Sequence, residues 1–260
     1  FNMSLQSILS ILFAFLGLIF GAFIAIFAER KHDKYVKYAE CLASGFMLAV
    51  VFFDLLPNAS EKAKFITVFL GLLAGIVIIL LFNKISFGEV CTKFPKNAII
   101  KKNKQSDMSC ELQSVSSLDN KRLMRNLTTA FAVALHNIPE GIALGSLNGQ
   151  EILVSTAILI ALHNIPEGVA MSIPLAKIGV KWYKIMLFAF LTGACTVLGW
   201  GAGILIGQIS DEVIAFLLAI SSGAMLQIVF GEMLAESENK NNGNITLVGL
   251  MIGMIIATLV

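Results

Sequence analysis

Charged residues are scarce in this sequence. Asp, Glu, Lys and Arg together make up 14% of its 260 residues, whereas soluble domains average about 25%. Hydrophobic residues reach 57%, and the mean hydropathy is +0.83. Such a chain has too little charge to cover a water-exposed surface, so we expect a multi-pass integral membrane protein. The net charge of +2 gives no indication of a nucleic-acid partner.

Cysteine and histidine are also rare, with 4 and 3 residues respectively. Cys91 and Cys110 have no histidine beside them, which argues against a zinc knuckle, and we expect them to be reduced thiols. Cys41 and Cys195 lie in apolar segments, where a thiol packs as a small apolar side chain. The cysteines therefore predict no disulfide framework.

Long apolar runs dominate the chain. A bilayer core of about 30 Å is crossed by roughly 20 apolar residues in a helix. Some runs are free of charge, and others reach this length only if they carry a few polar residues. The first run has neither a basic leader nor a convincing small-residue cleavage site, so we interpret it as a retained helix. We expect one transmembrane domain, 1–260, an all-α bundle of eight transmembrane helices at about 5–28, 37–58, 65–82, 127–147, 152–176, 185–210, 213–234 and 243–260.

The positive charges predict how these helices are oriented. Short cytoplasmic loops are rich in Lys and Arg, and all but two of the 19 such residues fall in alternate connections. The exceptions are Lys62 and Lys64. This distribution places both termini outside the cytoplasm, and it places the long polar loop 83–126, between helices 3 and 4, inside. The basic residues thus orient the chain and face the lipid headgroups.

The octapeptide ALHNIPEG occurs twice, at 134–141 and 161–168. An ionisable residue in a membrane helix costs about 2.5–3.5 kcal/mol on insertion scales, so it persists where it faces a partner, a cavity or an ion. In each copy His and Glu are four residues apart and therefore share one helix face. A short turn joins the two helices, which must run antiparallel. We expect both His–Glu sets to meet at one depth.

Each copy also carries a proline inside its helix. Pro139 and Pro166 have no N–H to donate, so the carbonyls of Leu135 and Leu162 lose their regular partners and the helices are expected to kink. Irregular backbone at this depth is tolerated where it lines protein or a wet cavity. The glycine that ends each copy permits close approach of a neighbouring helix.

Imidazole and carboxylate without clustered thiolates favour borderline divalent cations. Zn²⁺ is such a cation, Fe²⁺, Mn²⁺ and Cd²⁺ fit the same chemistry, and affinity alone does not separate them. The simpler interpretation is a His–Glu contact that only fixes the register of two helices, but such a contact would not need two identical copies. No organic cofactor is indicated.

At these residues the chain resembles the ZIP (Zrt/Irt-like) metal-ion transporters, whose fourth and fifth helices carry H-N-x-P-E-G and H-x-x-P-E-G. The resemblance covers essentially the whole chain. It implies transport of divalent metal, with zinc as the substrate, into the cytoplasm by alternating access through a site between helices 4 and 5. The metal-binding residues that it implies are His136, Asn137, Glu140, His163, Asn164, Glu167 and Met47, with Asp54 and Glu232 added from GFMLAVVFFDLLPNA and GAMLQIVFGEMLAES.

The sixth helix departs from the family pattern. Its usual S-G-x-x-E-P-x-G is TGACTVLG here, which puts Thr196 at the position of the glutamate and Val197 at that of the proline. In the family this glutamate bridges two metals, and Asn137 and Asn164 would belong to the second metal position. We therefore expect the second position to be empty or weak. The third loop also lacks a His cluster, which argues against metal buffering there.

Two other functions remain as alternatives. A metal-selective channel would use the same ligands. An intramembrane zinc hydrolase is the alternative from another class, but its H-E-x-x-H pattern needs a glutamate beside the first His, where this chain has Asn137 and Asn164. We therefore expect a transporter and no enzyme. Its expected partners are divalent metal ions and the bilayer, with a homodimer left open, and its expected location is the plasma (inner) membrane of a microbe.

Overall fold

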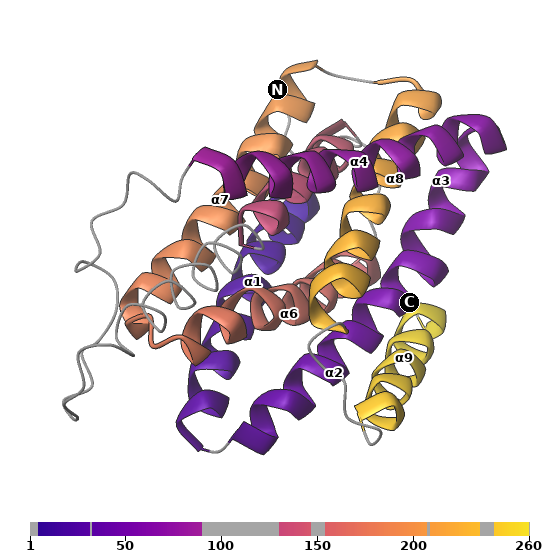
Figure 1. Ribbon diagram of the computed structural model, residues 1–260. Coiled ribbons are helices and arrows are strands. Elements are labelled where there is room, and N and C mark those ends of the chain that lie inside the picture. Colours follow the sequence, from indigo (N-terminus) through magenta and orange to yellow (C-terminus); the bar gives the residue numbers. More distant parts are fainter. Residues whose placement is uncertain are drawn as a thin grey trace, which may run out of the picture.

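The computed structural model describes residues 5–31, 33–89, 130–146, 154–206, 209–234 and 242–259. Every regular element in these ranges is a helix, which confirms the all-α class (Figure 1). The elements are α1 (Leu5–Lys31), α2 (Asp33–Val50), η1 (Val51–Leu55), α3 (Leu56–Lys62), α4 (Phe65–Glu89), the helical segment 130–146, α6 (Val154–Lys177), α7 (Trp182–Ile206), α8 (Asp211–Ile228), η3 (Val229–Met233) and α9 (Asn242–Leu259).

Apolar length marks several of these helices as membrane spans. Five stretches of the described residues are long and apolar enough to cross a bilayer: Ile8–Glu29, Tyr38–Lys62, Phe65–Lys84, Trp182–Ile206 and Asp211–Gly231. Large apolar side chains on their outer faces are exposed, as lipid contact requires. The helices therefore form a membrane-type bundle.

The connection after α4 begins later than the sequence predicts. We expected a loop from residue 83, but α4 continues to Glu89. Adding a residue to an existing helix costs little, because each one adds a hydrogen bond without a new nucleus. The rest of that connection, including Cys91 and Cys110, lies outside the described residues.

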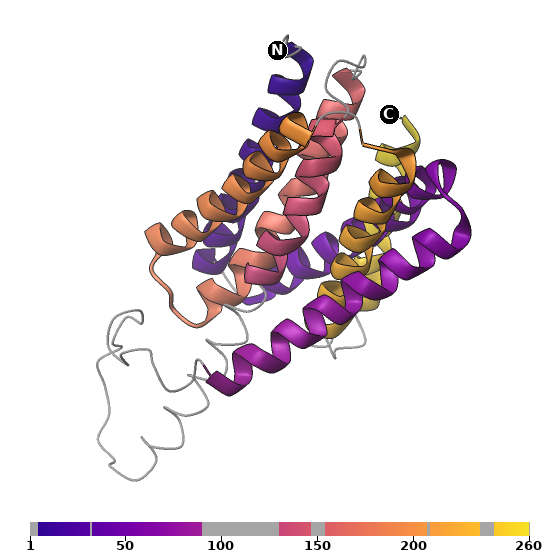
Figure 2. The same ribbon diagram turned by 90° about the horizontal axis from the view of Figure 1, so that it is seen from above.

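The helices group into two bundles, which Figure 2 shows from above. We call α1, segment 130–146, α6 and α7 the site bundle, and α2–η1–α3, α4, α8–η3 and α9 the flanking bundle. In the site bundle α1 packs against α6 and α7, whereas in the flanking bundle α2 packs on α9 and α4 on α8. The two bundles meet where α2 contacts α6.

Glycines bring helix backbones together within each bundle. In the site bundle, Gly141 faces Gly199 of α7, and a Cβ at Gly141 would overlap the carbonyl oxygen of Thr196. Gly145 meets Gly203 one turn further on. Both helices thus use small residues at a spacing of four, the pattern that lets membrane helices approach closely.

The second motif copy uses its glycine in the same way. Gly168 of α6 packs on Gly21 of α1, where a Cβ would overlap the backbone of Leu18. In the flanking bundle, Gly45 of α2 meets Gly249 of α9. At these glycines the backbones of neighbouring helices in one bundle are therefore in direct contact.

Side chains, in contrast, mediate the contact between the bundles. One apolar cluster draws its buried residues from helices of both bundles, among them Met47 of α2, Met171 of α6 and Met225 of α8. Methionine has an unbranched, adaptable side chain. This interface is therefore more tolerant of movement than the glycine contacts.

Two short π-helical segments lie within the helices of the flanking bundle. The segment η1 reads VFFDL and η3 reads VFGEM, so each begins with Val-Phe and carries an acid at its fourth position, Asp54 or Glu232. Single π turns inside α-helices occur frequently at functional sites. The likeness of VFFDL to VFGEM is a signal that sequence reasoning missed.

Candidate metal site

The two motif copies lie on neighbouring helices, and their ionisable side chains are buried. His136 and Glu140 belong to segment 130–146, and His163 and Glu167 belong to α6. Exposed fractions are 1% for His136, 4% for Glu140, 2% for His163 and 0% for Glu167. Charged groups buried to this extent must be paired or must bind an ion.

Each histidine contacts the glutamate of the other helix. His136 Nε2 lies 3.1 Å from Glu167 Oε1, and His163 Nε2 lies 2.7 Å from Glu140 Oε1. The sequence placed the His and Glu of one copy on one helix face, yet the observed contacts cross between helices. The four side chains are therefore held by reciprocal contacts.

A contact with the backbone fixes which ring nitrogen of His136 faces the site. Nδ1 lies 3.3 Å from the carbonyl oxygen of Ala132. A carbonyl oxygen only accepts hydrogen bonds, so Nδ1 carries the proton that it donates. This arrangement is typical of metal-binding histidines, whose second nitrogen is fixed by a backbone carbonyl or carboxylate. It directs Nε2 towards Glu167, where it can bind a cation.

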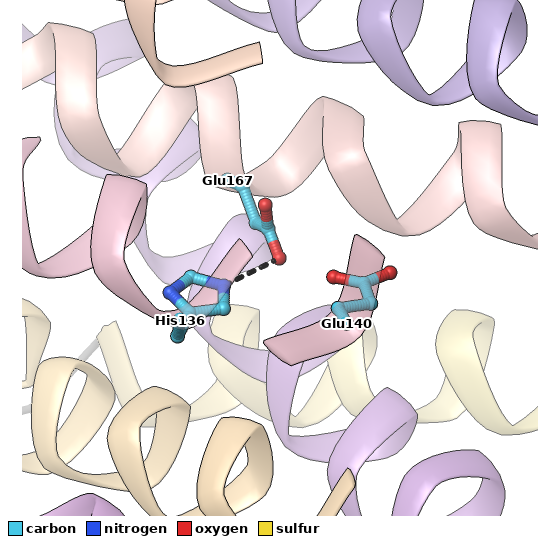
Figure 3. A group of neighbouring side chains, drawn as sticks. All are labelled: His136, Glu140 and Glu167. Atoms are coloured by element: carbon cyan, nitrogen blue, oxygen red, sulfur yellow. Dashed lines mark hydrogen bonds and ion pairs between the residues drawn. The ribbon is translucent and has the colours of Figure 1, made fainter. Parts of the chain in front are cut away.

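Three residues offer ligand atoms that all lie within 4.8 Å of one another: His136, Glu140 and Glu167 (Figure 3). His163 joins this group through its contact with Glu140. An imidazole and two carboxylates are ligands that zinc accepts, and the two negative charges balance a dication. The donor set fits a divalent metal.

Several buried polar atoms of the motifs have no hydrogen-bond partner among the described residues. They are both amide atoms of Asn137, Nδ1 of His163, Oδ1 of Asn164 and Oε2 of Glu167. A buried polar atom left without a partner costs about 1–3 kcal/mol. Their concentration at the motifs indicates a place built for a polar occupant.

Thr196 of α7 adds to this set. Its side chain is buried, and Oγ1 has no partner among the described residues. Its backbone carbonyl lies against Gly141, the last residue of the first motif copy. Thr196 therefore lies beside segment 130–146.

Neighbouring helices hold the site in place. Asn164 Nδ2 donates to the carbonyl oxygen of Ala14 on α1 at 2.9 Å. Ser221 of α8 donates from Oγ to the carbonyl oxygen of His136 at 3.0 Å. Sequence reasoning missed Ser221, because a serine in an apolar helix carries no sign of which carbonyl it will reach.

The remaining predicted residues lie on the flanking bundle. Met47 is fully buried on α2, in the apolar cluster that spans both bundles. Asp54 accepts a hydrogen bond from Asn58 at 2.7 Å and interacts electrostatically with His163 and Glu140. The side chain of Glu232 lies outside the described residues. Asp54 is thus near the candidate site.

Comparison with known proteins decides the family. The family model described as ZIP zinc transporter matches residues 2–260. This chain belongs to the ZIP zinc transporter family. ZIP proteins are transporters, so membership removes the hydrolase alternative.

Zinc transporters of bacteria and of a plant are similar to this chain over most of their length. The zinc transporter ZupT of Clostridium perfringens is 30% identical over 270 residues, covering 98% of this chain and 94% of the relative. ZupT of Oceanobacillus iheyensis is 32% identical, with 97% and 95% covered. The zinc transporter ZTP29 of Arabidopsis thaliana is 32% identical, with 82% and 78% covered.

Proposed function

We propose that this protein carries Zn²⁺ across a membrane into the cytoplasm, with His136, Glu140, His163 and Glu167 as the metal ligands. The observation that carries the proposal is the buried pair of reciprocal His–Glu contacts. Membership of the ZIP family supports zinc as the substrate. Fe²⁺, Mn²⁺ and Cd²⁺ are substrates that the same ligands accept.

Binding exchanges a proton for the metal. In the His136–Glu167 contact, Nδ1 already donates to a carbonyl, so Nε2 and the carboxylate share one further proton. A dication takes the place of that proton and bridges the same two groups. The helices need not rearrange around the ion, because the ligands are already directed at one another.

The two-bundle arrangement supports alternating access. Helix backbones are in close contact at glycines within each bundle, whereas adaptable side chains lie between the bundles. The ligands belong to the site bundle, and α2 and α8 of the flanking bundle cover them, as the Ser221 bond shows for α8. Movement of one bundle along the other exposes the site first on one side of the membrane and then on the other.

The topology that we propose has eight spans with both termini outside the cytoplasm. The Lys and Arg distribution supports it. Segment 130–146, α6 and α9 complete the set of five apolar spans. The setting is the plasma membrane of a microbe, where the chain acts alone or as a homodimer.

Uptake by purified protein in liposomes tests the proposal. Radiolabelled Zn²⁺ should accumulate with saturation, and unlabelled Mn²⁺, Fe²⁺ and Cd²⁺ should compete according to their affinity. The Glu140→Gln/Glu167→Gln double variant is the matched control and should not accumulate zinc. Wild-type uptake by this variant contradicts the site, and flux that fails to saturate indicates a channel.

A further inference from the structure

A partly buried ion pair joins the two bundles away from the candidate site. Nζ of Lys177 lies 2.7 Å from both Oε1 and Oε2 of Glu40. Lys177 is the last residue of α6 in the site bundle, and Glu40 lies in the first half of α2 in the flanking bundle. The side chains are 28% and 9% exposed, respectively. This contact therefore crosses the interface between the site bundle and the flanking bundle, along which the bundles would move during transport.

Moving the two helices apart at this point breaks the ion pair. A carboxylate as buried as that of Glu40 depends on its counterion, because an unpaired charge in a medium of low dielectric is costly. Both of its oxygens contact the same ammonium group, so moving α6 away from α2 removes both contacts at once. When the helices separate here, water must hydrate both charges or each charge must find a new counterion.

The position of the pair relates it to metal release. Lys177 follows Glu167 by ten residues on α6, which corresponds to about 15 Å along the helix axis. This end of α6 leads into the turn before α7, which the Lys and Arg distribution places in the cytoplasm. A metal that leaves the ligands towards the cytoplasm moves in the direction of this pair.

We propose that Glu40 and Lys177 form a latch that keeps the two bundles together on the cytoplasmic side and separates when that side opens to release the metal. The inference rests on the proposed function, since it assumes transport by relative movement of the bundles. The latch sets how readily the cytoplasmic side opens. It takes no part in binding the metal.

A second ion pair of the chain supplies a matched control. Nζ of Lys62 lies 3.1 Å from Oδ1 of Asp211, and this pair joins α3 to α8. Both of those helices belong to the flanking bundle. If the bundles move as units, the Lys62–Asp211 distance stays constant during transport while the Glu40–Lys177 distance changes.

Reversible crosslinking distinguishes the two pairs. In a background without native cysteines, Glu40→Cys/Lys177→Cys and Lys62→Cys/Asp211→Cys proteins are each linked by a bifunctional methanethiosulfonate reagent whose spacer replaces the two side chains. The link at 40 and 177 should reduce zinc uptake at least about tenfold, and dithiothreitol should restore it. The link at 62 and 211 should leave uptake unchanged. Native zinc uptake by the protein that is linked between positions 40 and 177 would contradict the proposed latch.

The kinetics of zinc uptake provide a second test, which does not depend on crosslinking. The neutral pair Glu40→Gln/Lys177→Gln should raise both Vmax and KM for zinc severalfold, because a weaker latch opens more often. The exchanged pair Glu40→Lys/Lys177→Glu should return both values towards those of the native protein. A neutral pair with native Vmax and KM, or with Vmax lowered in proportion to lost folded protein, overturns the inference.

The two failures are distinguishable. Uptake by the unlinked Glu40→Cys/Lys177→Cys protein tests whether the chain transports zinc at all. The ratio of linked to unlinked uptake tests only the latch. Absence of uptake in every unlinked protein, including the native one, would therefore reject the proposed function.

Discussion

Glu140 and His163 are 23 residues apart in the chain, and Oε1 of Glu140 lies 2.7 Å from Nε2 of His163. The carboxylate of the first motif copy is thus positioned by the imidazole of the second. The reverse contact, between His136 and Glu167, is 3.1 Å long. Each helix supplies one half of each contact, so loss of either motif copy disturbs both.

Removing either glutamate charge should abolish metal binding. Glu140→Gln and Glu167→Gln keep the size of the side chain and its hydrogen-bonding capacity but remove the negative charge that balances a dication. We expect zinc affinity of the purified protein to fall about a hundredfold or more for each, measured by isothermal titration calorimetry. Glu61→Gln, at an exposed carboxylate, is the control and should bind zinc normally. Native affinity in both motif variants would reject these ligands.

Zinc binding should weaken as the pH falls from 7.5 to 5.5. The metal replaces the proton that Nε2 of His136 shares with Glu167, so metal and protons compete for the same atoms. Affinity should therefore fall by up to about tenfold per pH unit for each proton displaced. Calorimetry in buffers of different ionisation enthalpy measures the number of protons released. Constant affinity over this range, with an unchanged melting temperature, would contradict the exchange.

One tightly bound metal per chain is expected, and Thr196→Glu should raise the number towards two. A second dication beside the first would share Glu140 and Glu167, which leaves about two positive charges without compensation. A glutamate at position 196, next to the first motif helix, supplies the missing charge. Anomalous scattering at the zinc edge counts the ions, and Thr196→Gln is the uncharged control. Two full-occupancy peaks about 3.5–4 Å apart in the native protein would refute the argument.

Gly199→Ala should destabilise the site bundle, whereas Gly201→Ala should not. A Cβ at Gly199 would overlap the carbonyl oxygen of Ile138, but a Cβ at Gly201 meets nothing within 4 Å. Forcing the helices apart costs about 1–3 kcal/mol, whereas alanine at an open helix position is favoured by about 1 kcal/mol over glycine. Thermal unfolding in detergent compares the two variants. Equal melting temperatures would show that this helix pair does not depend on close approach.

The sequence by itself determined the membrane class, the helical fold and the chemistry of the repeated motif. These properties are local, because apolar length fixes where a helix can span and a spacing of four fixes which side chains share a face. The departure at Thr196 could also be read from the sequence, since it lies within a short pattern.

Only the tertiary structure decided which helices are neighbours. The crossed pairing of His136 with Glu167, the Ser221 bond to the His136 carbonyl and the Glu40–Lys177 pair all join residues far apart in the chain. Each depends on how helices pack, and that packing follows from glycine contacts such as Gly141 on Gly199. Periodicity along one helix carries no information about the helix that will lie against it.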